Sequence, residues 1–537
     1  MSLWVGGPCL QCGEQMPKNM LRCRNCGASL ADEIQPVGVS NPASPPSKAT
    51  EPRSVKPPAE SRSAVPSTFP AGPQILPVAS TMSAGAVSAG ATSVSSACVF
   101  WGVALLLLAP LAVSGPIAGA PAALSIGWPR IHSGDEPHHL VLVNSVVADG
   151  DLDVANNYDR VHHGGRDAGE KFVGWALDHH VDWYWHHRRF HWWQVFETDY
   201  HVWHTDASGQ RVPTLRAQTA VPPPGEHEYS RHPAGLALVL APVLFPFRGT
   251  AAVEPLALVC SALCTVAGML FFRLMIGGYS PDRGHVALAT AAVFLGTPVW
   301  AYGRTLFPES FLMCCAVGAY ALALREWAFL RAGVLLALGL LIKPVFVLVA
   351  LPLFIDRVLA KDRGSLVRLG GPILLAVCVL ATINHRQHGL WFTPSLAWEP
   401  GFFLSGLMGL LFSVRHGLLP FAPISLVALL AWPAFLRDHQ REGLLLLAGA
   451  LLYVGLIAFS AEWGGGACYG PRLIAPVIPL LCVPLATWPA LPNWQNFRVR
   501  WALLAVGALS IGFNATGAFA CEHGWEKHPL ELLRQWI

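Results

Sequence analysis

The feature that most constrains this chain is a series of long apolar runs that begins near Ala97. The first run, residues 97–120, can cross a bilayer as a helix, which takes about 20 apolar residues. Of the 537 residues, 53% are hydrophobic and only 13% are charged, whereas soluble chains carry about 25% charged residues. The mean hydropathy is +0.43. The chain is therefore predicted to be an all-α polytopic protein embedded in a lipid bilayer.

Short polar links divide the rest of the chain into further apolar runs. The run from residue 232 to 247 is expected to be a re-entrant or interfacial helix on the outer side. With the half-length helices described next, the runs give about 11 membrane segments. The predicted spans after the first are residues 251–273, 285–300, 310–324, 369–383, 418–432, 444–459, 473–486 and 501–513.

The basic residues of the links set the expected orientation, because cytoplasmic links carry an excess of Lys and Arg. These links fall on one side only if residues 331–356 form two half-length helices that meet at Lys343 and Pro344, where the proline favours a break. The N-terminus is then cytoplasmic, and the links with unusual polar residues lie at the periplasmic or exoplasmic face. A single span over residues 331–356 would invert every later segment.

The N-terminal part is expected to hold a structural zinc ion. Cys9, Cys12, Cys23 and Cys26 form two pairs with the spacing of a four-cysteine zinc ribbon over residues 1–30. The alternative, paired disulfides, is disfavoured by the expected cytoplasmic location. No signal peptide is expected, because the first apolar run starts near residue 97.

The segment between the ribbon and the first span is predicted to be a disordered tether. Residues 31–96 are rich in Pro, Ser and Ala and have almost no large apolar side chains, so they cannot bury a core. Residues 97–537 are then the transmembrane domain, with a large first outer loop over residues 121–250.

Ionisable residues in the predicted outer links are the candidates for chemistry, because such residues at membrane depth are costly and are usually functional. Carboxylates could act as a general base or hold a divalent cation. Arginine and lysine could bind the phosphate of a lipid carrier. The acidic candidates are Asp135, Glu136, Glu309 and Glu462, and the basic ones are Arg231, His232, Arg304, Lys343, Arg415 and Arg472.

The order of these motifs resembles that of GT-C-fold glycosyltransferases, the relatives of protein O-mannosyltransferases and lipid A aminoarabinose transferases. Residues 133–138 (SGDEPH) and 149–158 (DGDLDVANNY) resemble the family's first outer loop, which residues 231–235 (RHPAG) close. Later counterparts are residues 303–305 (GRT) with Glu309, 343–344 (KP) and 463–472 (WGGGACYGPR). The resemblance covers residues 97–513.

The resemblance implies that a sugar moves from a polyprenyl-phosphate donor to an acceptor at the outer face. Asp135 would be the catalytic base, with Glu136 beside it. Arg231, Lys343 and Arg472 would contact the donor phosphate. The sequence identifies neither the sugar nor the acceptor, and it leaves open a divalent cation at the outer site.

Other interpretations of the same residues remain open. Asp135 with Glu136, and Glu309 after its proline, could simply favour helix N-termini, where acidic residues are common. The acidic run from Asp149 could bind Ca²⁺, although it lacks the sixth-position glycine and final glutamate of an EF-hand. The function could instead be that of a secondary transporter, which also uses broken helices, or of a membrane sensor with a cytoplasmic ribbon. No nucleic-acid partner is expected at a net charge of only +3.

Overall fold

The computed structural model divides the chain into two units, residues 1–88 and residues 89–537. It describes residues 7–8, 15–16, 90–114, 125–126, 131, 135–154, 157, 203–205, 211–213, 229–230, 232–250, 252–388, 391, 400–466, 468–490, 496–519 and 528–536. In the first unit these are β1 (Gly7–Pro8) and β2 (Gln15–Met16), which pair antiparallel. The four predicted zinc ligands and nearly all of the predicted tether lie outside the described residues.

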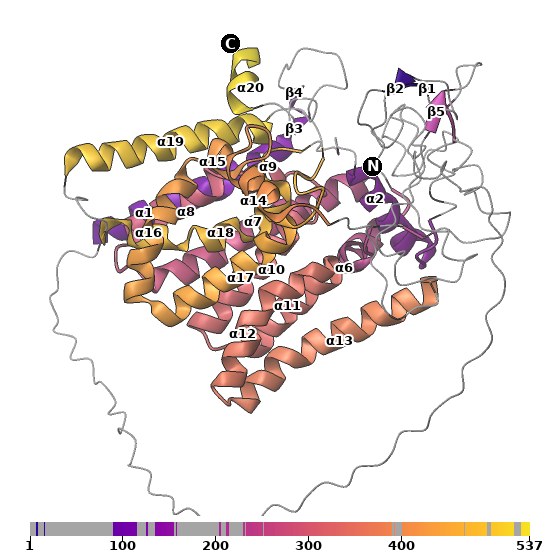
Figure 1. Ribbon diagram of the computed structural model, residues 1–537, viewed down its shortest axis with the longest axis horizontal. Coiled ribbons are helices and arrows are strands. Elements are labelled where there is room, and N and C mark those ends of the chain that lie inside the picture. The colour runs from indigo at the N-terminus through magenta and orange to yellow at the C-terminus, as the bar shows by residue number, and fades with distance from the viewer. Residues whose placement is uncertain are drawn as a thin grey trace, which may run out of the picture. The chain divides into compact units, whose positions relative to one another are not determined.

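The described residues of the second unit are almost entirely helical (Figure 1). Its short strands pair antiparallel as β3 (Val113–Ser114) with β4 (Ser125–Ile126) and β5 (Trp203–Thr205) with β6 (Arg211–Pro213). The helical elements up to the middle of the chain are α1 (Gly90–Leu108), η2 (Ala109–Ala112), α2 (Glu136–Asn144), η3 (Ser145–Asp149), α6 (Gly235–Leu244), η5 (Phe245–Phe247), α7 (Val253–Gly277), α8 (Arg283–Leu295), α9 (Val299–Tyr302) and α10 (Glu309–Arg325). They continue with α11 (Phe329–Ile342), η6 (Pro344–Phe346), α12 (Val347–Leu359), α13 (Arg363–His388), α14 (Phe403–Phe412), α15 (Leu418–Phe421), α16 (Ile424–Asp438), α17 (Gln440–Ala458), η7 (Arg472–Val477), α18 (Ile478–Leu481), η8 (Val483–Ala490), α19 (Phe497–Phe519) and α20 (Pro529–Trp536).

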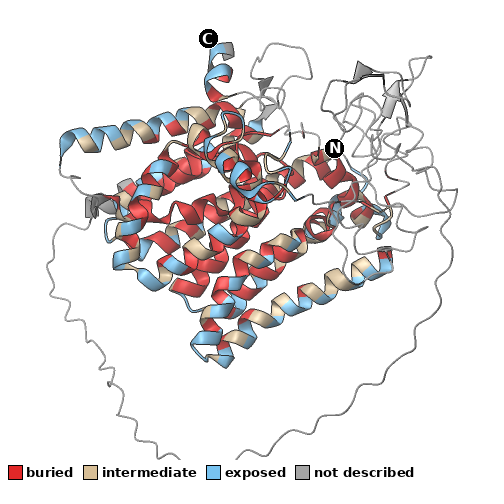
Figure 2. Cartoon of the chain, viewed as in Figure 1, coloured by how far each residue is buried: buried red, intermediate tan, exposed pale blue. Residues whose placement is uncertain are grey.

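Among the described residues, 4 helices are long and apolar enough to cross a membrane: α7, α13, α17 and α19. This composition is that of an all-α, multi-pass membrane protein. The outer faces of α13 and α19 are largely exposed or half-buried (Figure 2), as expected of helices that face lipid. The shorter apolar helices do not by themselves establish the predicted number of about 11 membrane segments.

The predicted break at Lys343 is present, and the chain reverses there. Arg357, near the end of α12, lies 5.0 Å from the ring centre of Phe329 at the start of α11. The two helices therefore run antiparallel, with Lys343 at the tip. With 14 residues, α11 is about 21 Å long, too short to cross a hydrocarbon core of about 30 Å. We call this unit the α11–α12 hairpin.

Ion pairs fasten the base of the α11–α12 hairpin to α17. The carboxylate of Asp356 binds both Arg357 and Arg441, the latter through contacts of 2.7 and 2.9 Å. A few residues away, Arg325 at the end of α10 donates to Glu442 at 3.1 Å. The hairpin is thus fixed at the end opposite Lys343.

Prolines break three predicted spans. The span over residues 285–300 is divided into α8 and α9 next to Pro298, and the span over residues 418–432 is divided into α15 and α16 at Pro423. The span over residues 473–486 is not a continuous α-helix but a series of short helical turns, η7, α18 and η8. A proline removes a backbone donor and clashes with the preceding turn, so repeated prolines prevent one regular helix.

Two further helices differ from the sequence prediction. α14 has only 10 residues, too few for a span, and lies in the link between the predicted spans over residues 369–383 and 418–432. α1 begins at Gly90, inside the predicted tether. The predicted re-entrant run is α6, whose 10 residues reach about 15 Å, and its first residue packs against Leu341 near the hairpin tip.

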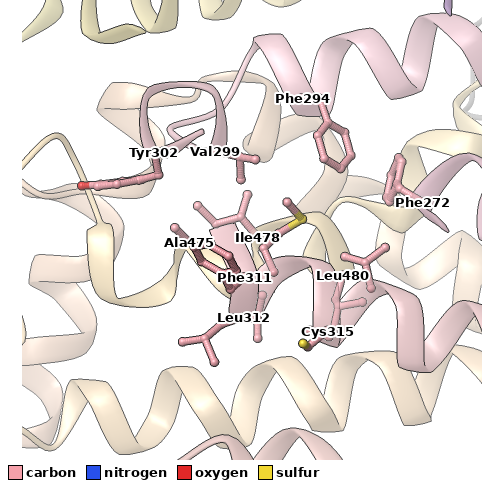
Figure 3. Close-up of a cluster of buried hydrophobic side chains, with 14 of the residues drawn as sticks. Phe272, Phe294, Val299, Tyr302, Phe311, Leu312, Cys315, Ala475, Ile478 and Leu480 are labelled. Carbon is pink, nitrogen blue, oxygen red and sulfur yellow. The ribbon is translucent and has the colours of Figure 1, made fainter. Parts of the chain in front are cut away.

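The core of this unit surrounds α10. All residues of this helix from Glu309 to Leu324 are buried, so α10 is enclosed by protein rather than by lipid. Figure 3 shows side chains of α7, α8, α10 and α18 meeting around it: Phe272, Phe294, Phe311, Leu312, Cys315, Ile478 and Leu480. Because α10 is fixed on all sides, its first residue has a well-defined position.

Candidate active site

Arg472 joins two carboxylates that lie far apart in the sequence. Its Nη1 lies 2.8 Å from Oδ2 of Asp135, and its Nε donates to Oε1 of Glu309 at 3.2 Å. Its guanidinium carbon lies 3.7 Å from the centre of the Phe307 ring. The Arg472 side chain is only 10% exposed. A buried arginine between two acids on different elements fixes those elements relative to each other.

Asp135 is positioned for this pair rather than for helix capping. It is the N-cap residue of α2, but its side chain makes no capping hydrogen bond. Burial by itself would raise the pKa of Asp135. The positive charge of Arg472, with a smaller contribution from His232, outweighs burial and holds the pKa well below its usual range. The carboxylate is therefore ionised at neutral pH.

Glu309 is the first residue of α10, directly after Pro308. The residue is 1% exposed, and the positive end of the helix dipole favours a carboxylate there. Oε1 accepts from Arg472, whereas Oε2 is buried without a hydrogen-bond partner among the described residues.

Lys343 lies at the tip of the α11–α12 hairpin in extended backbone, with φ −149° and ψ 110°. Burial lowers the pKa of Lys343, and the nearby charges of Glu309 and Asp135 partly offset this. No hydrogen bond or ion pair of its ammonium group is found within the described part of the chain. We call Asp135, Glu309, Lys343 and Arg472 the Arg472 cluster.

Three buried histidines lie beside Asp135. The rings of His138 and His139, both on α2, lie 5.7 and 4.6 Å from that of His232. Burial lowers the pKa of His139 to about 3, even though Asp135 favours the charged form, so His139 is neutral at pH 7. The sequence assigned no role to His139, although its position four residues after Asp135 on a helix was a usable signal.

A glycine-rich loop leads into Arg472. Gly465, Gly466 and Gly470 have φ of 74°, 75° and 60°, values that glycine adopts without strain. The thiol of Cys468 donates to the Gly464 carbonyl at 3.2 Å, and Gly465 in turn presents its carbonyl oxygen 3.5 Å from Nη1 of Arg472. The loop backbone therefore helps to orient the guanidinium.

Several predicted site residues lie outside the Arg472 cluster. Oε1 of Glu136 accepts from the Leu306 amide at 2.7 Å, and Arg304 donates to the Ala518 carbonyl at 3.0 Å. These contacts hold separate segments together. Arg415 and Glu462 are exposed. Arg231 lies outside the described residues.

No group of three or more His, Cys, Asp or Glu side chains within the described ranges is arranged to hold a metal ion. In the Arg472 cluster, the guanidinium of Arg472 takes the position between the carboxylates of Asp135 and Glu309. In the acidic run from Asp149, the alternative Ca²⁺ site, the carboxylate of Asp151 accepts a hydrogen bond from the hydroxyl of Ser145 at 3.0 Å. The divalent cation at the outer site stays a prediction.

Comparison with known proteins gives a low structural likeness. No protein-family model matches the chain, and no curated protein matches it. An oligosaccharyltransferase of Archaeoglobus fulgidus in complex with Zn and sulfate is 11% identical, with a TM-score of 0.42 over 79% of this chain and 53% of the other. The oligosaccharyltransferase AglB of the same organism, in complex with an inhibitory peptide and a dolichol-phosphate, is 13% identical, with a TM-score of 0.42 over 80% and 56%. The chain thus spans about half the length of these proteins, and likeness at this level does not bear on the roles of residues.

Proposed function

We propose that this chain is an integral-membrane glycosyltransferase that moves a sugar from a polyprenyl-phosphate donor to an acceptor at the outer face of the membrane. The observation that carries the proposal is the Arg472 cluster. Its four members come from the start of α2, the start of α10, the hairpin tip and the start of η7. Two acidic and two basic residues, of which Glu309 and Arg472 are buried and Asp135 and Lys343 half-buried, thus gather from segments spread over more than 300 residues of the sequence.

One basic side chain of the cluster is available to bind a phosphate. The cluster holds two acidic and two basic side chains, and His139 beside it is neutral at pH 7. Arg472 is already paired with both acids, and Lys343 is the member without a direct ion pair in the described part of the chain. An ammonium group binds phosphate as a point charge, so Lys343 is the first contact that we assign to the donor phosphate.

Asp135 is proposed as the base that takes the acceptor proton. While it is paired with Arg472 its pKa is held too low for efficient proton transfer at neutral pH. A donor phosphate next to Lys343 would attract the Arg472 guanidinium, which forms two parallel hydrogen bonds with phosphate oxygens. Part of the Arg472 charge would then leave Asp135, and the basicity of this carboxylate would rise when the donor is bound.

The proposed reaction is a single displacement. The acceptor oxygen forms a bond to the anomeric carbon as the bond between that carbon and the phosphate oxygen breaks. Asp135 receives the acceptor proton, and the electron pair of the broken bond leaves with the lipid phosphate, where Lys343 and Arg472 stabilise its charge. We further propose that the N-terminus is cytoplasmic and that its four cysteines hold a structural zinc ion.

The test is transfer from labelled undecaprenyl-phosphate sugars by the purified full chain in lipid nanodiscs. We expect Asp135→Asn to reduce the transfer rate at least 100-fold, because general acid–base catalysis contributes about 10²–10⁴-fold. Glu326→Gln, at an exposed ion pair with Arg331 at the far end of α10, is the matched control and should transfer normally. Wild-type rates in Asp135→Asn would exclude Asp135 as the base.

A further inference from the structure

Two buried atoms, on residues that interact electrostatically with Lys343, have no hydrogen-bond partner among the described residues. They are Oε2 of Glu309 and Nδ1 of His139, on residues that are 1% and 5% exposed. Buried polar groups are nearly always hydrogen-bonded, because a buried group without a partner loses its hydrogen bonds to water and gains none in the protein. Two such atoms on elements that meet at one site point to a ligand that supplies the missing partners.

Both groups lie within electrostatic reach of Lys343. Glu309 is the carboxylate that most strongly favours the charged form of Lys343, yet the two groups form no ion pair among the described contacts. Lys343 also acts electrostatically on the His139 ring. Arg472 joins Glu309 to Asp135, and His139 lies one helical turn after Asp135 on α2, so Glu309 and His139 belong to the same site as Lys343.

The chemistry of the two atoms restricts the ligand group. Oε2 of Glu309 is a carboxylate oxygen whose partner Oε1 accepts from Arg472, so it calls for a group that donates a hydrogen bond. It would repel a phosphate oxygen at the same place. Nδ1 of His139 can donate or accept, according to its tautomer. A hydroxyl group satisfies both requirements, since its proton can reach the carboxylate while its oxygen accepts from another donor.

We propose that Glu309 and His139 form a sugar-hydroxyl subsite next to the donor phosphate. This inference rests on the proposed function, and it assigns sugar recognition to these two residues. If Lys343 holds the phosphate on the anomeric carbon, the nearest ring hydroxyl is the one on carbon 2. Hydrogen bonds to that hydroxyl strengthen as charge develops on the ring in glycosyl transfer. Glu309 and His139 are therefore expected to select donors that carry this hydroxyl.

The experiment measures equilibrium binding of four lipids to the full chain in nanodiscs. The probes are undecaprenyl phosphate, its glucose and mannose derivatives, and the 2-deoxy derivative that these two sugars share. We expect the wild type to bind a glucose or mannose lipid about tenfold more tightly than the 2-deoxy lipid, the worth of one hydrogen bond to a charged group. Glu309→Gln and His139→Leu should reduce this preference, and His139→Asn, which keeps a polar atom near the Nδ1 position, should retain part of it.

Undecaprenyl phosphate without a sugar separates this inference from the proposed function. Glu309→Gln should bind the bare lipid phosphate at least as tightly as the wild type, because a repelling charge is gone, whereas Lys343→Met should bind both kinds of lipid more weakly. If the wild type binds lipid phosphate but does not prefer either sugar over the 2-deoxy form, the subsite is refuted and the transferase proposal stands. If the wild type binds no lipid phosphate, the proposed function itself fails and the subsite fails with it.

Discussion

Gly235 offers a way to move Lys343 without touching the Arg472 cluster. It is the first residue of α6, and it packs directly on the backbone at the end of α11. A Cβ added there would lie 1.9 Å from the carbonyl oxygen of Leu341 and 2.1 Å from its carbonyl carbon. Non-bonded carbon contacts are comfortable at about 3.5–4.0 Å, so α6 and the hairpin tip would have to part by about 1.5 Å. Lys343 is two residues from the point of contact and must follow.

We therefore expect Gly235→Ala to destabilise the protein by about 1–3 kcal/mol, the usual cost of overpacking. A displacement of about 1 Å at a reacting centre can cost about 100-fold in rate, so transfer should fall by a similar factor. Thermal unfolding in detergent and the transfer assay measure the two effects. Gly371→Ala is the matched control, because no atom lies within 4 Å of its added Cβ. A Gly235→Ala protein that melts and transfers like the wild type would refute the close approach of α6 to the hairpin.

Two further predictions concern Glu136 and the pH dependence of stability. Glu136→Leu should lower the melting temperature, because the buried Leu306 amide loses its acceptor at a cost of about 1–3 kcal/mol. Glu136→Gln should keep most of the stability and the transfer activity. A Glu136→Gln protein that melts normally but does not transfer would show that Glu136 takes part in the chemistry. The pKa of His139 falls from 6.5 to about 3 on folding, so below pH 6.5 the unfolded chain binds a proton that the folded chain excludes. The free energy of unfolding should therefore fall by up to about 1.4 kcal/mol per pH unit as the pH drops from 6.5 towards 5. Melting curves of wild type and His139→Asn over that range test this, and equal pH dependence in the two would contradict it.

Much of the fold could be predicted because its signals are local. Apolar runs predict helices, and Lys343 followed by Pro344 predicts the break that the structure has. Hydropathy predicted a continuous helix over residues 473–486, around Pro476, where prolines lie close together and the structure has only short helical turns. Hydropathy averages over a window and takes no account of a missing backbone donor. The apolar α14 was missed for the opposite reason, since a window set to the length of a span overlooks a shorter helix.

The candidate site could be predicted only in part. Asp135, Glu309, Lys343 and Arg472 were named from their types and their places in polar links, and the structure brings them together. Which of two adjacent acids faces the cluster depends on helix phase at a single residue. Sequence pattern does not give that phase at a helix start, so Glu136, which binds a backbone amide, could not be told from Asp135. Arg304 is similar, because its hydrogen bond to a distant carbonyl depends on tertiary packing.

The α11–α12 hairpin has a consequence for how the protein is made. Neither arm is long enough to hold itself across a bilayer, and together they return the chain to the side from which it came. Insertion machinery that selects complete apolar spans would not retain either arm alone. Because α11 packs against α13, and α12 against α13 and α17, we expect the hairpin to enter the bilayer only after these longer helices have been made.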